Sequence, residues 1–184
     1  MTQTEAVAQA LLLNELSGNR YATYRFSKAS SASGFSFGVC QWDLTHNTEA
    51  ATILHSCGFT QFEIACLEKG LMPDRAGYDA RLLANKSVID SADLVEFQAI
   101  VSWVQEVLTN GGISVADLET FTHLCDYHNQ FHLDSKGQCE QYLASLGRQV
   151  VAEDVLKFKL STKWGEIDPG DVHRRWNNIH SIFE

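Results

Sequence analysis

Apolar positions in the N-terminal stretch recur at the spacing of an amphipathic helix. Val7, Leu11 and Glu15 are spaced i, i+4 and i+8, so a carboxylate shares one stripe with apolar side chains. We expect Thr4 to cap this helix and Gly18 to end it. The pattern therefore predicts a helix whose apolar face finishes at Glu15.

Residues 19–42 change to a strand-like pattern, rich in Tyr and Phe around a Ser/Ala/Gly centre. This composition predicts a β-hairpin whose turn lies near Ser30 to Gly34. The second half alternates bulky with small residues: Phe35, Phe37 and Val39 on one face, and Ser36, Gly38 and Cys40 on the other. We expect the bulky face to pack on the core and the small face to line a ligand cleft.

From residue 45 onward the apolar spacing is helical. Caps and glycine stops divide this part into predicted helices. These run from Thr45 or Asn47 to Cys57, from Thr60 to about Gly70, from Tyr78 to Asn85, from Asp90 or Ser91 to Gly111, from a Ser114–Asp117 capping box to Phe131, and over 136–146, 151–161 and 170–182. The sequence thus predicts one domain over residues 1–184, of class α+β but mostly α, with one hairpin near its start.

The overall composition is that of a globular protein. Of the 184 residues, 45% are hydrophobic and 20% are charged, and no apolar run approaches the roughly 20 residues that span a bilayer. The formal net charge of −9 argues against nucleic acid as a partner, because phosphate binding needs a basic surface. The five cysteines are widely spaced without a CxxC pair, which favours reduced thiols packed as small hydrophobes.

A carboxylate on an apolar stripe suggests a specific chemistry. Desolvation raises the pKa of such a group, so it can stay protonated and give its proton to a leaving oxygen. That is the general-acid step of glycoside hydrolysis. The alternative is that Glu15 is a solvated residue at a frayed helix end.

The segment after the predicted hairpin turn carries a family resemblance. Phe37-Gly-Val-Cys-Gln-Trp-Asp43 resembles the F-G-L-M-Q-V-D stretch of goose-type lysozymes and the G-L-M-Q stretch of lytic transglycosylases. Glu15-Leu-Ser-Gly18 is similar to the E-S-x-x-G start of the same families, with Leu16 in place of the serine and the glycine one residue early. The resemblance covers about residues 10 to 48 and implies a lysozyme-like fold: a helix ending in Glu, a hairpin and a helical remainder.

The resemblance also implies roles for individual residues. Glu15 would be the catalytic acid, and Asp43 would position the attacking water. Ser36 falls where phage-type lysozymes have a threonine that faces the cleft. Gly38 and Gln41 would bind substrate, and Tyr127 and Asn129 would match a Tyr-Asn pair on a later helix of those families, although here one residue intervenes and a surface helix face is the alternative. Independently of the resemblance, Trp42 is a candidate to stack on a sugar. Residues 16–36 contain no Asp or Glu, however, so the second carboxylate of those relatives has no equivalent there.

Other candidate sites are weaker. His128 and His132 are spaced i, i+4, as in some zinc sites, and His123 and Cys125 lie on the same predicted helix, but no HExxH pattern accompanies them. We therefore expect no metal and no cofactor. Three tryptophans are expected in the core: Trp103, Trp164 and Trp176.

The sequence thus predicts a muramidase that cleaves peptidoglycan between N-acetylmuramic acid and N-acetylglucosamine. Three alternatives stay open: a lytic transglycosylase that uses Glu15 alone, a chitosanase-like hydrolase, and a domain of the same fold that only binds glycan or protein. We expect a monomer whose partners are glycan strands and an immunity or inhibitor protein, without membrane insertion. The N-terminus has no Lys or Arg before its apolar stretch, which predicts synthesis in the cytoplasm without a signal peptide and later release, as for a phage endolysin or an injected toxin.

Overall fold

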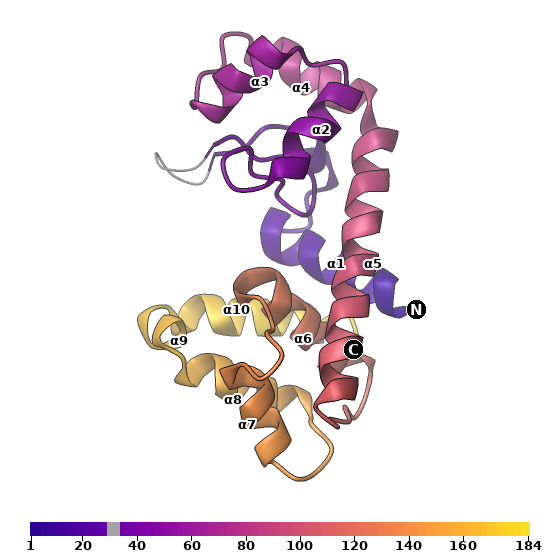
Figure 1. Cartoon of the computed structure of the whole chain (residues 1–184), viewed down its shortest axis with the longest axis vertical. Coiled ribbons are helices and arrows are strands. Elements are labelled where there is room, and N and C mark those ends of the chain that lie inside the picture. The colour runs from indigo at the N-terminus through magenta and orange to yellow at the C-terminus, as the bar shows by residue number, and fades with distance from the viewer. Residues whose placement is uncertain (29–33) are drawn as a thin grey trace. The chain divides into compact units, whose positions relative to one another are not determined.

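The computed structural model describes residues 1–28 and 34–184, and over these ranges the chain is predominantly helical (Figure 1). This confirms the mostly α class. The helices in the described residues are α1 (Gln3–Leu16), the short 3-10 helix η1 (Arg20–Tyr24), α2 (Thr48–Ser56), α3 (Gln61–Glu68), α4 (Arg75–Ala84), α5 (Lys86–Asn110), α6 (Leu118–Phe131), α7 (Gln138–Ser145), α8 (Ala152–Ser161), α9 (Lys163–Ile167) and α10 (Pro169–His180). No helix in these ranges is long and apolar enough to cross a bilayer.

The N-terminal starts of α2 and α3 follow the predicted capping chemistry. The Asn47 side chain accepts the N–H of Glu49 at the start of α2. Thr60 and Glu63 form a reciprocal capping box at the start of α3, where the Glu63 carboxylate accepts the Thr60 N–H at 2.8 Å. These side chains satisfy backbone donors that have no partner inside a helix, which is why the sequence locates these ends well.

Three other helix starts differ from the prediction. Thr2, not Thr4, caps α1, because its hydroxyl accepts the Glu5 N–H while the Glu5 carboxylate accepts the Thr2 N–H. Helix α5 begins directly after Asn85 rather than at residue 90, since the Asn85 carbonyl already accepts from the next turn. Asp117 alone caps α6, and the preceding Val115 instead pairs with Val150 in a parallel β-bridge.

The predicted β-hairpin is not confirmed. Its first half forms η1, because the Asn19 side chain caps this turn by accepting the Tyr21 N–H at 3.1 Å. Within the described residues, the two halves meet at one antiparallel bridge, in which Ser27 and Ser36 exchange N–H···O bonds of 2.8 Å. The turn expected from Ser30 lies outside the described residues, apart from Gly34 at its end.

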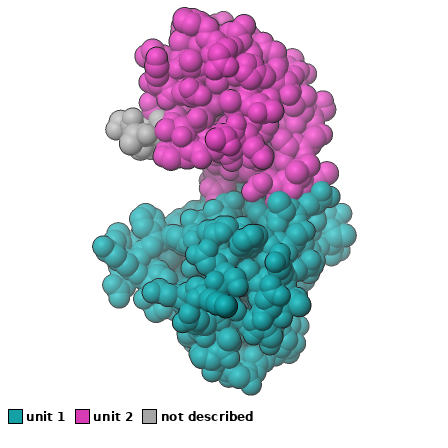
Figure 2. All heavy atoms as spheres, viewed as in Figure 1, with its two compact units in different colours: residues 1–14, 97–184 teal, residues 15–96 magenta. Residues whose placement is uncertain are grey.

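The described chain divides into two compact units (Figure 2). Unit 1 comprises residues 1–14 and 97–184, and unit 2 comprises residues 15–96. The sequence predicts a single domain, and that remains a prediction. Glu15 is the first residue of unit 2.

The core of unit 2 is built around aromatic rings. The Phe26 ring meets Phe35, Phe37 and Phe59 edge to face, with centroids 5.8 to 6.1 Å apart. The bulky residues Phe35 and Phe37 therefore face a core, as their spacing predicts.

In unit 1, helix α10 packs against α6, α8 and α9.

Three of the four tryptophans differ in burial from the expectation. Trp42, expected to meet a ligand, is only 3% exposed, whereas Trp103 and Trp164, expected in the core, are 40% and 46% exposed. Trp103 lies at the surface with its indole N–H donating to the Leu133 carbonyl at 2.7 Å. Apolar spacing alone does not separate these cases, because an indole can bury its N–H wherever an acceptor is present.

Candidate functional site

Residues 38–42 form a tight turn in unit 2 that carries the centre of the lysozyme-like motif. Gly38 donates its N–H to Thr23, and Trp42 donates its N–H back to Phe37 at 2.8 Å. Gly38 has a φ of +74° and Gln41 a φ of +51°. The chain therefore leaves the extended conformation at Gly38, and the strand-like alternation of the sequence stops there.

The small residues of this segment do not face a cleft, so the predicted small outer face is wrong. Ser36 is 6% exposed and its backbone pairs with Ser27. A Cβ on Gly38 would lie 2.6 Å from the Trp42 ring and 2.8 Å from the Asp93 carboxylate. The space beside Gly38 is thus filled by the protein's own side chains.

Asp93 on α5 holds this turn, and sequence reasoning did not identify it. Its Oδ2 accepts the Val39 N–H at 2.8 Å, and its Oδ1 accepts the Trp42 indole N–H at 2.8 Å and the Cys40 N–H at 3.3 Å. The carboxylate is 2% exposed, and burial raises the pKa of Asp93 despite the three donors that oppose the shift. The signal was present: Ile89, Asp93 and Phe97 share one stripe, as Val7, Leu11 and Glu15 do.

The Cys40 thiol brings Glu15 into the same neighbourhood. Burial raises the pKa of Cys40 above its usual value, and the negative charges of Asp93, Glu96 and Glu15 add to this shift. Glu15 is half-buried near the end of α1, and its charge acts on a side chain of the motif turn. Unit 2 therefore contains both the predicted acid and the segment F-G-V-C-Q-W-D, and the role of Glu15 stays a prediction.

Glu96 adds a further carboxylate to this neighbourhood. It is half-buried on α5, one helical turn after Asp93. Burial raises the pKa of Glu96, and the charges of Glu49 and Asp93 raise it further. The carboxylates of Asp93 and Glu49 thus oppose the ionisation of Glu96.

Asp43 closes the motif in a turn of its own. Its Oδ1 accepts the Thr45 N–H at 2.7 Å and lies 3.4 Å from the His46 imidazole. Burial acts to raise the pKa of Asp43, but the bonds from Thr45 and His46 outweigh it and hold the pKa below its usual value. Asp43 is therefore a charged group that stabilises the 43–47 turn, and its role towards water stays a prediction.

The Gln41 side chain ties the motif turn to the β-bridge. Its Nε2 donates to the Gly38 carbonyl at 2.9 Å, and its Oε1 accepts the Ser27 hydroxyl at 3.0 Å. Both polar ends of Gln41 are thus engaged within unit 2. These bonds fix the orientation of the side chain that the resemblance places at the substrate.

Tyr127 and Asn129 lie in unit 1, on the second half of α6. The Tyr127 ring packs against Phe131 and Phe158, and burial raises the pKa of Tyr127 to about 12. Asn129 is half-buried. The structure gives each a packed position on α6, and their role towards a substrate stays a prediction.

Asp126, which directly precedes Tyr127 on α6, belongs to a buried ion-pair cluster that the sequence did not reveal. Asp126 accepts from Lys159 at 3.0 Å, from Arg175 and from the Asn14 amide at 2.9 Å. Gln130 also accepts from Lys159, at 2.8 Å. This cluster joins α1, α6, α8 and α10, so the polarity of α6 serves the interior of unit 1 rather than a surface face.

His123 and His128 lie on α6, and His132 follows its end as the C-cap residue. The Nδ1 atom of His128 accepts the Leu133 N–H at 3.1 Å, and the His128 and His132 rings contact each other and Trp103. Across residues 1–28 and 34–184, no group of three or more His, Cys, Asp and Glu side chains is arranged to hold a metal ion.

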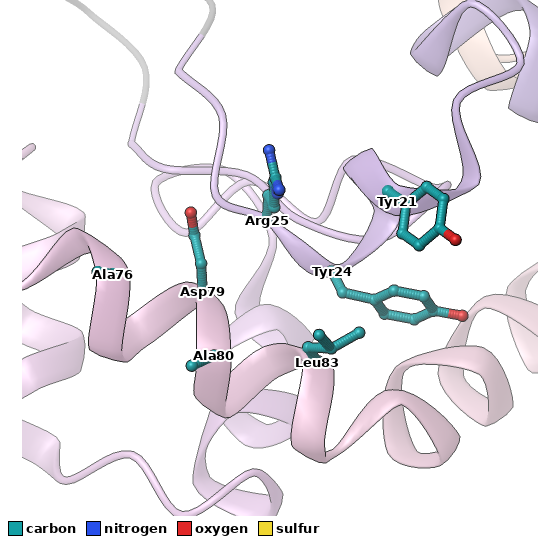
Figure 3. A pocket seen from close by; sticks show the side chains of 7 residues that line it. All are labelled: Tyr21, Tyr24, Arg25, Ala76, Asp79, Ala80 and Leu83. Carbon is teal, nitrogen blue, oxygen red and sulfur yellow. The ribbon is translucent and has the colours of Figure 1, made fainter.

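A separate open pocket of about 300 Å³ lies between η1 and α4 in unit 2. Figure 3 shows the Tyr21 and Tyr24 rings close together on one side and the aliphatic Leu83 on α4 beside them. The Tyr24 hydroxyl donates to Asp90 at 2.7 Å, so only its ring is presented to the pocket. None of the residues singled out from the sequence lines it.

Comparison with known proteins adds no assignment: no family model, curated protein or solved structure matches this chain.

Proposed function

We propose that this protein is a peptidoglycan-cleaving glycosidase that acts on the bond between N-acetylmuramic acid and N-acetylglucosamine, with Glu15 as the general acid. One observation supports the proposal: the half-buried carboxylate that ends the apolar stripe of α1 belongs to the same compact unit as the lysozyme-like motif turn. These two features are 22 or more residues apart in the sequence, and both belong to unit 2.

In the proposed mechanism, Glu15 gives a proton to the glycosidic oxygen as the bond to the anomeric carbon breaks. A water molecule then attacks that carbon, and the proton that it loses returns to Glu15. The buried Asp93 and half-buried Glu96 give the surroundings a negative potential, which favours the positive charge that develops on the sugar ring.

The bonds made by Asp43 favour lytic transglycosylation as a second candidate. Its carboxylate already accepts from Thr45 and contacts His46, and residues 16–36 offer no acidic group. Without a carboxylate that orients water, Glu15 would act first as acid and then as base. The 6-hydroxyl of the muramic residue would attack its own anomeric carbon, and a 1,6-anhydro ring would form.

Dye release from labelled, purified cell walls tests the proposed function. The proposal expects release by the wild-type protein, and co-sedimentation with walls without release would instead indicate a binding domain. A parallel assay on chitosan tests the chitosanase reading, because cleavage of chitosan alone would contradict action on peptidoglycan.

Mass spectrometry of the released fragments separates the two mechanisms. Hydrolysis leaves reducing ends, whereas transglycosylation leaves anhydro-muropeptides that are lighter by one water. Asp43→Asn is expected to lower the rate strongly if reducing ends are found, and mildly if anhydro products are found.

A further inference from the structure

We propose that Asp93 is a positioning residue, which clamps the Gly38–Trp42 turn to α5 and thereby fixes Cys40 and Gln41 in the motif turn. This inference rests on the proposed function, and it assigns a role to a side chain outside the lysozyme-like motif. Asp93 itself is 2% exposed and acts through the turn, so it is not placed in contact with substrate.

The contacts of Asp93 converge on three of the four positions from Val39 to Trp42. Both carboxylate oxygens are used, one by Val39 and the other by Cys40 and Trp42. Two of the three donors are backbone N–H groups, so Asp93 fixes the main chain and not only a side chain. Bonds from N–H groups to an ionised carboxylate are stronger than neutral ones, which makes this clamp rigid.

The turn would have no comparable partner without this carboxylate. A buried N–H left without an acceptor is unfavourable, and here three donors would lose theirs. The burial of Asp93 also carries an electrostatic cost, since its pKa is raised rather than lowered. The conformation that Asp93 enforces explains why its carboxylate is buried here despite this cost. In that conformation Gly38 and Gln41 both have positive φ.

The clamp links α5 to the turn that carries Cys40 and Gln41. The Cys40 thiol lies 4.0 Å from the Asp93 carbonyl, and it is the thiol on which the charge of Glu15 acts. Gln41 follows directly and is bonded to Gly38 and Ser27. A turn released from Asp93 would shift Cys40 and Gln41, and misplacements of about 1 Å can lower rates about a hundredfold.

Asp93→Asn tests the clamp, with Asp90→Asn as the matched control. Asp90 lies one turn earlier on α5 and is exposed, and its carboxylate accepts the Tyr24 hydroxyl but no N–H of the turn. For Asp93→Asn we expect kcat on soluble glycan strands to fall about 10- to 100-fold with KM changed less than about threefold. We expect amide hydrogen exchange at Val39 and Cys40 to be at least about tenfold faster. Asp90→Asn should change each quantity less than about twofold.

The outcomes are separable. Unchanged exchange at Val39 and Cys40 in Asp93→Asn would overturn the clamp, and faster exchange with unchanged kcat would overturn its positioning role. An inactive wild-type protein would instead refute the proposed function, and with it the role of Asp93 in that reaction. If Asp93→Asn does not fold, Trp42→Phe removes only the indole donor, and the same split between kcat and KM is expected at about threefold to tenfold.

Discussion

Asp93 and Asp126 are both enclosed, at 2% and 1% exposed, but the groups around them differ in charge. Burial acts to raise both pKa values. Asp126 also meets Lys159 and Arg175, whose charges outweigh burial and hold its pKa well below the usual value. The donors that oppose the effect of burial on Asp93 are uncharged, and its pKa is raised. The first carboxylate is thus part of an ion-pair cluster in unit 1, and the second is the anchor of a turn in unit 2.

Asp126→Asn should destabilise unit 1 strongly. The substitution leaves Lys159 and Arg175 buried without the carboxylate they share, and breaking such a pair typically costs about 3–5 kcal/mol. The control is Asp171→Asn, which breaks a more exposed ion pair with Arg174 on α10 and should cost less than about 1 kcal/mol. Urea unfolding of both variants measures the difference, and equal costs would show that the cluster does not stabilise the fold.

His123 should make the protein less stable in mild acid. Burial lowers the pKa of His123 to about 4, so the imidazole takes up a proton more readily in the unfolded chain, where its pKa is about 6.5. Stability from this group is therefore lost as pH falls from about 6.5 to about 4. His123→Phe keeps an aromatic ring against Trp176 and should remove roughly 2 to 3 kcal/mol of the loss in unfolding free energy between pH 7 and 4.5. An unchanged pH dependence would contradict the assignment.

At the scale of elements, the turn at Gly38 is where prediction from sequence failed most clearly. Alternation of bulky and small residues indicates a strand. Together with the family resemblance, it predicts that a sugar lies beside Gly38. The positive φ of Gly38 and Gln41 and the buried ring of Trp42 depend on Asp93, which is 51 residues beyond Trp42. Local patterns carry no information on a partner so distant in the chain.

Gly38→Ala should therefore destabilise the fold rather than only block a ligand. A side chain at φ +74° costs roughly 1–2 kcal/mol, and the new Cβ would also overlap Trp42 and Asp93. Gly58→Ala is the control, because Gly58 has a φ of +82° and open space around it. Thermal unfolding should show Gly38→Ala less stable than Gly58→Ala by about 1–3 kcal/mol, the usual cost of overpacking. Equal stability of the two variants would show that the space beside Gly38 is not filled in solution.

Helix positions, by contrast, could largely be read from the sequence. Capping by Asn47 and by Thr60 with Glu63 uses residues within three positions of the helix start, so local chemistry is sufficient. The start of α5 was missed because Asn85 ends α4 and its carbonyl already accepts bonds from the first turn of α5. The short α9 was not expected, and it begins where Thr162 accepts the Gly165 N–H.

At the scale of the whole molecule, the sequence points to Glu15 but not to Asp93. A carboxylate on an apolar stripe is unusual, and Glu15 is half-buried in unit 2, the unit that also holds the motif turn; its role as the acid stays a prediction. The same criterion applied to α5 would have found Asp93. The Asp126 cluster could not be found this way, since Lys159 and Arg175 come from helices whose packing against α6 is a tertiary feature.

The central claim is that Glu15 donates the proton, and Glu15→Gln tests it most directly. The control is Glu68→Gln, an exposed glutamate at the end of α3. Dye release from purified cell walls is measured for both variants, together with their melting temperatures. We predict that Glu15→Gln lowers the rate by about 10²- to 10⁴-fold at an unchanged melting temperature, while Glu68→Gln cleaves like wild type. Near-normal release by a folded Glu15→Gln variant would contradict the account.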